Sequence, residues 1–109
     1  LDTANGRAAS GVKVDLFSVN DNGGFSVLTS VITNRDGRVE GSVIEGDEFA
    51  VGVYELHFHV GAYFAGRAKS VHPAFLDLVP VRFGISVPDE HYHIPLLISP
   101  FGYSTYRGS

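Results

Sequence analysis

The stretch FAVGVYELHFHV, residues 49–60, carries the signal that decides the fold. From Tyr54 to Val60 every second side chain is large and apolar, and the positions between them hold Glu55, His57 and His59. Because successive side chains of a β-strand point to opposite faces, this alternation predicts a long strand with one face in the core and the other turned outward.

Six more segments between turn signals have the composition of short strands. They span residues 11–17, 25–33, 39–43, 76–87, 91–99 and 101–107. Pro80 suits an edge strand or a bulge, because proline lacks the backbone N–H that a central strand needs. Residues 61–70 are the one weak helix candidate, and their two glycines limit it to about two or three turns. Many short strands with little helix predict an all-β chain folded as an antiparallel β-sandwich.

Length and composition bound the class of protein. The 109 residues suffice for one hydrophobic core, so residues 1–109 are expected to form a single domain. A net charge of −4, with both signs scattered, argues against nucleic acid as a partner, and no apolar run is long enough to span a membrane. Without cysteine there is no disulfide, thiolate nucleophile or thiolate metal ligand.

Four of the five histidines occur as two H-x-H pairs, HFH at His57 and His59 and HYH at His91 and His93. On a strand both members of a pair point to the same face, where two imidazoles suit a zinc site completed by a third ligand. They equally suit a general base with an orienting partner near neutral pH. The alternative is two polar strand faces turned toward solvent, and the spacing alone does not choose among these.

Two arginines and the last serine are further candidates. Arg38 follows a tight turn whose Asp36-Gly37 pair suits a backbone with positive φ. An arginine fixed there can polarise a carbonyl or hold an anion, and Arg107 allows the same interpretation; for both, the alternative is a solvated side chain. Ser109 lacks the G-x-S-x-G context of a serine nucleophile, so hydrogen bonding or the positioning of a water suits it better.

The C-terminal stretch HYHIPLLISPFGYSTYRGS, residues 91–109, resembles the closing signature of the 5-hydroxyisourate hydrolases, the enzyme branch of the transthyretin-related proteins. Residues 1–17 resemble the opening strand and loop of that family, TNRDGR at 33–38 its central turn, and residues 49–58 the strand before its helix. The resemblance covers nearly the whole chain. The terminal Y-R-G-S is its most specific part, because transthyretin itself lacks that ending.

The resemblance implies a transthyretin-like β-sandwich of two four-stranded sheets with one short helix. It implies that two protomers join edge to edge and that two dimers pack face to face as a homotetramer, with the active sites in the channel between them. The implied reaction is the hydrolytic opening of 5-hydroxyisourate, the product of urate oxidation, to 2-oxo-4-hydroxy-4-carboxy-5-ureidoimidazoline. No metal or other cofactor is implied.

The family's functional residues carry over by position. The expected catalytic residues are Arg38, His93 and Ser109. The residues expected to bind substrate are His91, Tyr106, Arg107 and Gly108. In this scheme His93 deprotonates a water and Arg38 stabilises the oxyanion formed on a ring carbonyl. For His91 the alternatives are an effect on the protonation of His93 and a position in solvent.

Two features depart from the family pattern. The first strand of the family usually reads T-H-V-L-D with a catalytic histidine, and this sequence begins at the leucine, so that histidine is expected two places ahead of Leu1. Ala8 stands where the family commonly has proline, which should loosen a loop and leave the chemistry intact.

Two other functions are open. One is a transthyretin-like carrier that binds a small molecule of the thyroid-hormone type in the same channel without catalysis. The other is a zinc hydrolase built on the two H-x-H pairs. The favoured compartment is the cytoplasm, with the periplasm and the peroxisome left open because the residues ahead of Leu1 are not given.

Overall fold

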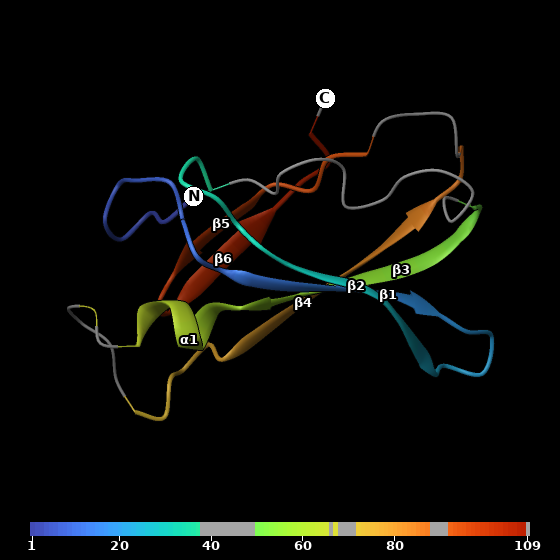
Figure 1. The fold of residues 1–109 in the computed structure, drawn as a ribbon, viewed down its shortest axis with the longest axis horizontal. Helices are drawn as coiled ribbons and strands as arrows, with labels where there is room; N and C mark the ends of the chain where they lie inside the picture. Colours follow the sequence, from blue (N-terminus) through green and yellow to red (C-terminus); the bar gives the residue numbers. More distant parts are fainter. Residues whose placement is uncertain (38–49, 66, 68–71, 88–91, 109) are drawn as a thin grey trace.

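The computed structural model describes residues 1–37, 50–65, 67, 72–87 and 92–108 (Figure 1). The elements along the chain are β1 Lys13–Val19, β2 Phe25–Ile32, β3 Gly52–His59, α1 Val60–Phe64, β4 Leu78–Ile85, β5 Leu96–Ser99 and β6 Gly102–Thr105. The described residues are therefore mostly β with one short helix, as the sequence pattern predicts.

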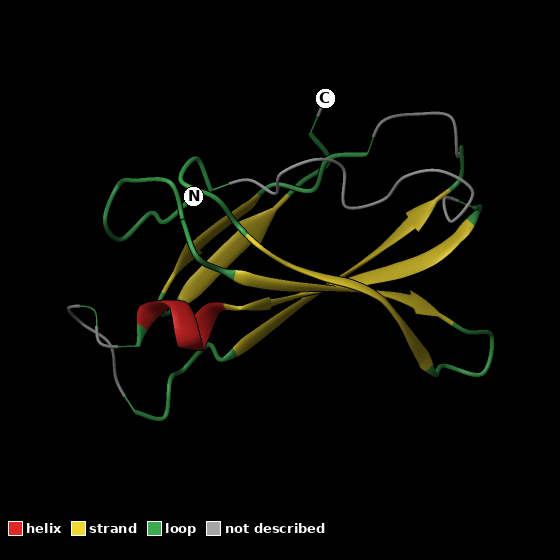
Figure 2. Cartoon of the chain, in the orientation of Figure 1, coloured by secondary structure: helices red, strands yellow, loops and turns green. Residues whose placement is uncertain are grey.

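The strands of the described residues form two sheets (Figure 2). The larger has the order β2-β1-β3-β4 with antiparallel neighbours, and the smaller is the β5-β6 hairpin. Two four-stranded sheets were expected, and the described residues show four strands and two. Residues 39–43, predicted as a strand, lie outside the described residues, and residues 1–3 join β5 through a single bridge at Asp2, too short to form a strand.

Alternation along β1 and β3 builds the core, as predicted. Val14 and Leu16 of β1 and Tyr54, Leu56 and Phe58 of β3 are all buried on the same side of the larger sheet. Buried side chains from both sheets and from α1 meet in one cluster: Ala9, Val12, Val14, Leu16, Tyr54, Leu56, Phe58, Val60, Tyr63, Phe64, Val79, Ile85 and Ile98. The two sheets are thus the two layers of a sandwich.

One strand is shorter than predicted because of a proline in its backbone. The strand expected over 91–99 begins only at Leu96, directly after Pro95, which has no N–H for a ladder. Pro80 lies in β4, an edge strand of the larger sheet, which confirms its predicted position.

The helix is five residues long, and among the described residues no helix has the length and apolar character to cross a membrane.

The first residues of the chain run parallel to β5. The Leu1 nitrogen donates to the Leu96 carbonyl, the Ile98 N–H donates to the Leu1 carbonyl, and the Thr3 N–H donates to the Ile98 carbonyl. Each of these hydrogen bonds has a donor–acceptor distance of 2.8 Å. Asp2 stands opposite Ile98 in this parallel pairing. The smaller sheet, which is formed by residues near the C-terminus, is therefore also hydrogen-bonded to the first residues of the chain.

The fully buried carboxylate of Asp2 fixes this pairing to the helix. Its Oδ2 accepts hydrogen bonds from the Tyr63 hydroxyl at 2.8 Å and from Asn5 Nδ2 at 2.7 Å, and its Oδ1 accepts the Asn5 N–H at 3.0 Å. Burial raises the pKa of Asp2, but the hydrogen bonds from Asn5 and Tyr63 outweigh it and hold the pKa below its usual range. A buried carboxylate with this many donors is stable as an anion.

Substituting asparagine for Asp2 should destabilise the fold. An amide offers one acceptor oxygen instead of two, so at least one donor of Asn5 or Tyr63 loses its acceptor. A buried donor without a partner costs about 1–3 kcal/mol. Urea unfolding followed by circular dichroism should show the loss, and a double-mutant cycle with Tyr63→Phe should show coupling between the two positions. An unchanged midpoint in Asp2→Asn would contradict this role.

The pH dependence of the unfolding free energy, compared between the parent and Asp2→Asn, tests the contribution of the negative charge on Asp2. Because the pKa of Asp2 is lower in the folded chain than in the unfolded one, its stabilisation is complete above the unfolded value of about 3.9 and is lost as the pH falls through the folded value. The difference in unfolding free energy between the parent and Asp2→Asn should therefore narrow as the pH is lowered below about 4. A difference independent of pH would show that the carboxylate charge contributes nothing.

Candidate functional site

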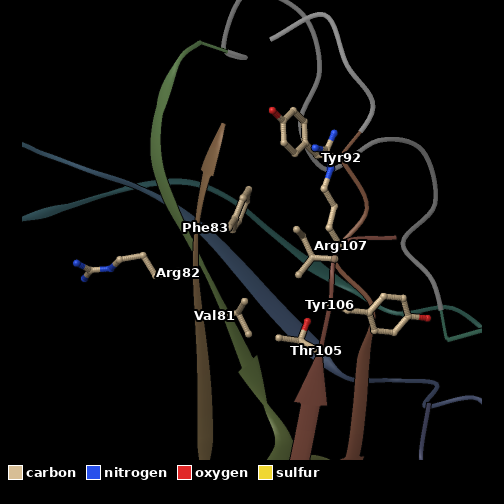
Figure 3. Close-up of a pocket in the computed structure, with 8 residues that line it drawn as sticks. Val81, Arg82, Phe83, Tyr92, Thr105, Tyr106 and Arg107 are labelled. Carbon is tan, nitrogen blue, oxygen red and sulfur yellow. The ribbon is translucent and has the colours of Figure 1, made fainter. Parts of the chain in front are cut away.

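A cavity of about 200 Å³ lies between β4 and the C-terminal segment (Figure 3). The residues that line it are Val81, Arg82, Phe83, Tyr92, Ile94, Thr105, Tyr106 and Arg107. Figure 3 shows Val81 and Phe83 facing Thr105 and Arg107 across the cavity, whereas the Arg82 side chain leaves β4 in the other direction. The cavity therefore has an apolar wall from the larger sheet and a polar wall from residues 92–107.

Tyr92 and Arg107 form a stacked pair at the end of this cavity. The Arg107 guanidinium carbon lies 4.3 Å from the centroid of the Tyr92 ring. The Tyr92 oxygen accepts the N–H groups of Ser86 and Val87, each at 3.2 Å, just beyond the end of β4. The hydrogen bond from Val87 is the main reason that the pKa of Tyr92 lies below its usual range. Tyr92 thus links the C-terminal segment to the larger sheet and orients Arg107.

His93 and Gly108 lie directly side by side. The Gly108 N–H donates to the His93 carbonyl at a distance of 2.8 Å, and the two residues form an isolated antiparallel bridge. His93 is exposed, and the imidazole ring lies against the backbone of Gly108. Two residues predicted for the site from opposite ends of the C-terminal signature are therefore in contact.

Arg107 and Tyr106 point in different directions. The register of the hairpin places Leu96 opposite Thr105 and Ile98 opposite Tyr103, so the face that carries Thr105 is the one turned toward the core. Arg107 extends that face, as its alternation with Thr105 predicts, and reaches the cavity. The Tyr106 ring is 60% exposed and points away from Arg107 (Figure 3).

Three of the predicted site residues, Arg38, His91 and Ser109, lie outside the described residues. The turn that leads to Arg38 is described and has the predicted form. Gly37 has a φ of +73° and donates its N–H to the Asn34 carbonyl at 2.9 Å. A side chain at Gly37 would stand 3.0 Å from the Ala9 nitrogen, so this turn packs closely on the loop before β1.

Sequence reasoning missed Tyr92 and the apolar wall of the cavity. Tyr92 stands between the two histidines of HYH, and alternation places it on the face opposite theirs, toward the core. This alternation is the sequence signal that could have identified Tyr92 as a residue on the core side. Val81 and Phe83 have no local signal, since they became cavity residues only by the packing of β4 against the C-terminal segment.

The HFH pair on β3 is engaged with carboxylates on the outer face of the larger sheet. His57 Nε2 lies 2.8 Å from Glu55 Oε1, and His59 Nε2 lies 2.7 Å from Asp15 Oδ2. Glu55 lies on the outward face, as expected, but it is only 6% exposed, because His57 and Arg82 cover it and Arg82 Nε donates to its other oxygen at 2.7 Å. In the described residues no group of three or more His, Cys, Asp or Glu side chains is arranged to hold a metal.

The fold and the site together define a small β-sandwich protein with a histidine and an arginine held at one end of its C-terminal hairpin. The sequence profile of the HIUase/Transthyretin family matches residues 1–108, and the chain belongs to this family. It is 56% identical over 110 residues to 5-hydroxyisourate hydrolase 2 of Rhizobium meliloti, an alignment that covers 100% of this chain and 91% of that protein.

Two solved structures show the breadth of this fold. A crystal structure of (S)-allantoin synthase superposes with a TM-score of 0.90 at 45% identity; the match covers 100% of this chain but only 41% of that one. Sea bream transthyretin in complex with thyroxine superposes with a TM-score of 0.86 at 27% identity, covering 99% of this chain and 89% of the other. The fold is thus shared by proteins of different function.

Replacing Tyr92 tests whether its ring holds the C-terminal segment. Tyr92→Leu removes the ring beneath Arg107 as well as the hydroxyl, whereas Tyr92→Phe removes the hydroxyl alone. A cation–π contact of about 0.5–1 kcal/mol corresponds to about a two- to fivefold change in local opening. Hydrogen exchange of the Gly108 amide, which is bonded to the His93 carbonyl, should be faster by that factor in Tyr92→Leu than in Tyr92→Phe. Equal rates in the two variants would contradict the stack's role.

Proposed function

We propose that this chain is a 5-hydroxyisourate hydrolase of urate degradation, which opens its substrate to 2-oxo-4-hydroxy-4-carboxy-5-ureidoimidazoline. The observation that carries the proposal is the contact between His93 and Gly108 beside the oriented Arg107, in a chain 56% identical to a protein of that name. The contact brings His93 and Gly108, from the two ends of the family's closing signature, next to each other.

The proposed reaction is an attack of water on a ring carbonyl. His93 takes a proton from the water as general base, and the hydroxide adds to the carbonyl carbon. Arg38 is the proposed partner of the oxyanion, where one fixed donor contributes about 2.7–4 kcal/mol in other enzymes. Collapse of the intermediate breaks the ring C–N bond, and the protonated histidine returns its proton to the departing nitrogen. No cofactor takes part in this scheme.

Substrate binding falls to the C-terminal segment in this proposal. Arg107 presents a guanidinium whose orientation is supported by Tyr92, and such a planar donor suits the carbonyl oxygens of an oxidised purine. Ser109 is proposed to position the attacking water, and Tyr106 and His91 to line the site on the outer side of the hairpin.

The parallel pairing of residues 1–3 with β5 supports a role for a histidine two places ahead of Leu1. Asp2 stands opposite Ile98, so in the same register that position falls opposite Pro95, two residues from His93. A histidine there would share the proton with His93 in the proposed reaction. Assays of the proposed function therefore use a chain in which Thr-His-Val precedes Leu1.

Assembly is proposed to follow the family's pattern of a homotetramer. In the described residues β4 and β6 end their sheets without a further strand, and all four residues of β6 are exposed. Exposed edges of this kind favour pairing with a second protomer. We also propose an architecture of two four-stranded sheets with residues 39–43 as one of the strands, residues 1–109 as one domain, and the cytoplasm as its compartment. A monomer mass by light scattering would contradict the assembly.

The kinetic test follows the decay of freshly prepared 5-hydroxyisourate by absorbance. His93→Ala should lower kcat by about 10²–10⁴, the range for loss of a general base, and Arg38→Ala by about 10²–10³. A chain without Ser109 should lose rate with the same substrate. Lys13→Ala, at the start of β1 and outside the proposed site, is the control variant and should keep the parent rate. Parent rates in all three site variants would show that the assignment is wrong.

The second candidate is a carrier, favoured by the similarity to a transthyretin solved with thyroxine. A carrier channel is expected to be lined by apolar and hydroxyl groups, whereas the proposed hydrolase site has an imidazole from His93 and a guanidinium from Arg107. Displacement of a fluorescent thyroxine analogue distinguishes the two functions. Tight binding without decay of hydroxyisourate would favour the carrier over the hydrolase.

A further inference from the structure

Gly108 occupies a position that admits no side chain. A Cβ built on it would stand 2.5 Å from His93 Nδ1, 3.0 Å from His93 Cγ and 3.2 Å from Pro95 Cγ. The first two distances are below or at the limit of what packed atoms tolerate, and both involve the same imidazole. The backbone of the C-terminal segment therefore passes flat against the Nδ1–Cγ edge of His93.

The neighbouring contacts leave the segment little freedom to move away. The Gly108 N–H is bonded to the His93 carbonyl at 2.8 Å, which holds the two residues at a fixed separation. One residue earlier, Arg107 is stacked on Tyr92, whose oxygen is bonded to the backbone at the end of β4. Pro95 limits movement on the remaining side. A methyl group at position 108 would thus displace the imidazole more readily than the backbone.

We propose that Gly108 is a positioning residue for His93, and that its backbone sets the imidazole so that Nε2 is the nitrogen presented to the attacking water. This role rests on the proposed function only for its catalytic consequence. The Nδ1 edge is covered by the Gly108 backbone, and Nε2 lies at the opposite end of the ring. Because a misplacement of about 1 Å can lower a rate by about 10², a small rotation of this ring has a large effect on kcat.

The hairpin provides a matched control at Gly102. A Cβ there would meet only Ser99 Oγ, at 3.7 Å, which is ordinary van der Waals contact. Gly102→Ala therefore adds the same methyl group to the same hairpin, and we expect it to leave the imidazole of His93 and the rate unchanged. Comparison of the two variants separates the contact with His93 from the general effect of replacing a glycine.

The kinetic measurement compares Gly108→Ala with Gly102→Ala in the chain that carries Thr-His-Val ahead of Leu1. We expect kcat of Gly108→Ala to fall by about ten- to a hundredfold while KM changes less than about twofold, because the displaced group acts on the water rather than on the bound substrate. A rise in KM alone, with kcat unchanged, would overturn the positioning role.

A second measurement does not depend on catalysis. In protein labelled with ¹⁵N-histidine, Gly108→Ala should shift the ring nitrogen resonances of His93, and Gly102→Ala should leave them in place. Parental resonances in Gly108→Ala would overturn the proposal. If the parent protein fails to hydrolyse hydroxyisourate but the His93 resonances shift as expected, the proposed function falls and the positioning contact stands.

The stability of a double variant guards against simple misfolding. Gly108→Ala should lower the thermal midpoint in the parent, and the loss should largely vanish in a His93→Ala background, because the opposing ring is then absent. An equal loss in both backgrounds would place the strain elsewhere in the segment and would overturn the assignment to His93.

Discussion

The buried carboxylate of Asp2 is the interaction on which the rest of the structure depends. It joins the first turn of the chain through Asn5, the helix through Tyr63, and β5 through the parallel backbone pairing with Ile98. The side chain of Asp2 therefore holds the first turn and the helix, while the backbone of the residues on either side of it holds β5. Since β5 leads back through Pro95 to His93, a shift of the first residues would be transmitted to the histidine of the site.

The candidate site depends on the opposite directions of two neighbouring side chains, Tyr92 and His93. Tyr92 turns to the core side, where its ring supports Arg107 and its oxygen binds the end of β4, while His93 turns to the exposed side and contacts Gly108. Neighbouring residues thus serve two surfaces of one hairpin. The guanidinium is placed by a contact inside the sandwich, and the imidazole by a contact on its surface.

The parts of this structure that were predictable are those decided by near neighbours in sequence. Alternation in β1 and β3 identified the core face, Asp36-Gly37 identified a turn with positive φ, and Pro80 identified an edge strand. The burial of Glu55 was not predictable, because it depends on Arg82 from another strand. The closing signature pointed to His93 and Gly108 by resemblance, but their atomic contact depends on the pairing of segments fifteen residues apart.

The pairing of Leu1–Thr3 with β5 also has a consequence for how the chain acquires its structure. The hydrogen bond between Leu1 and Leu96 spans 95 positions, so this contact closes a long loop. During synthesis β1 and β2 leave the ribosome well before β5 does, and the first residues must wait without their partners. The high contact order of this one junction favours its formation as a late step, so the site would be assembled only after the larger sheet has formed.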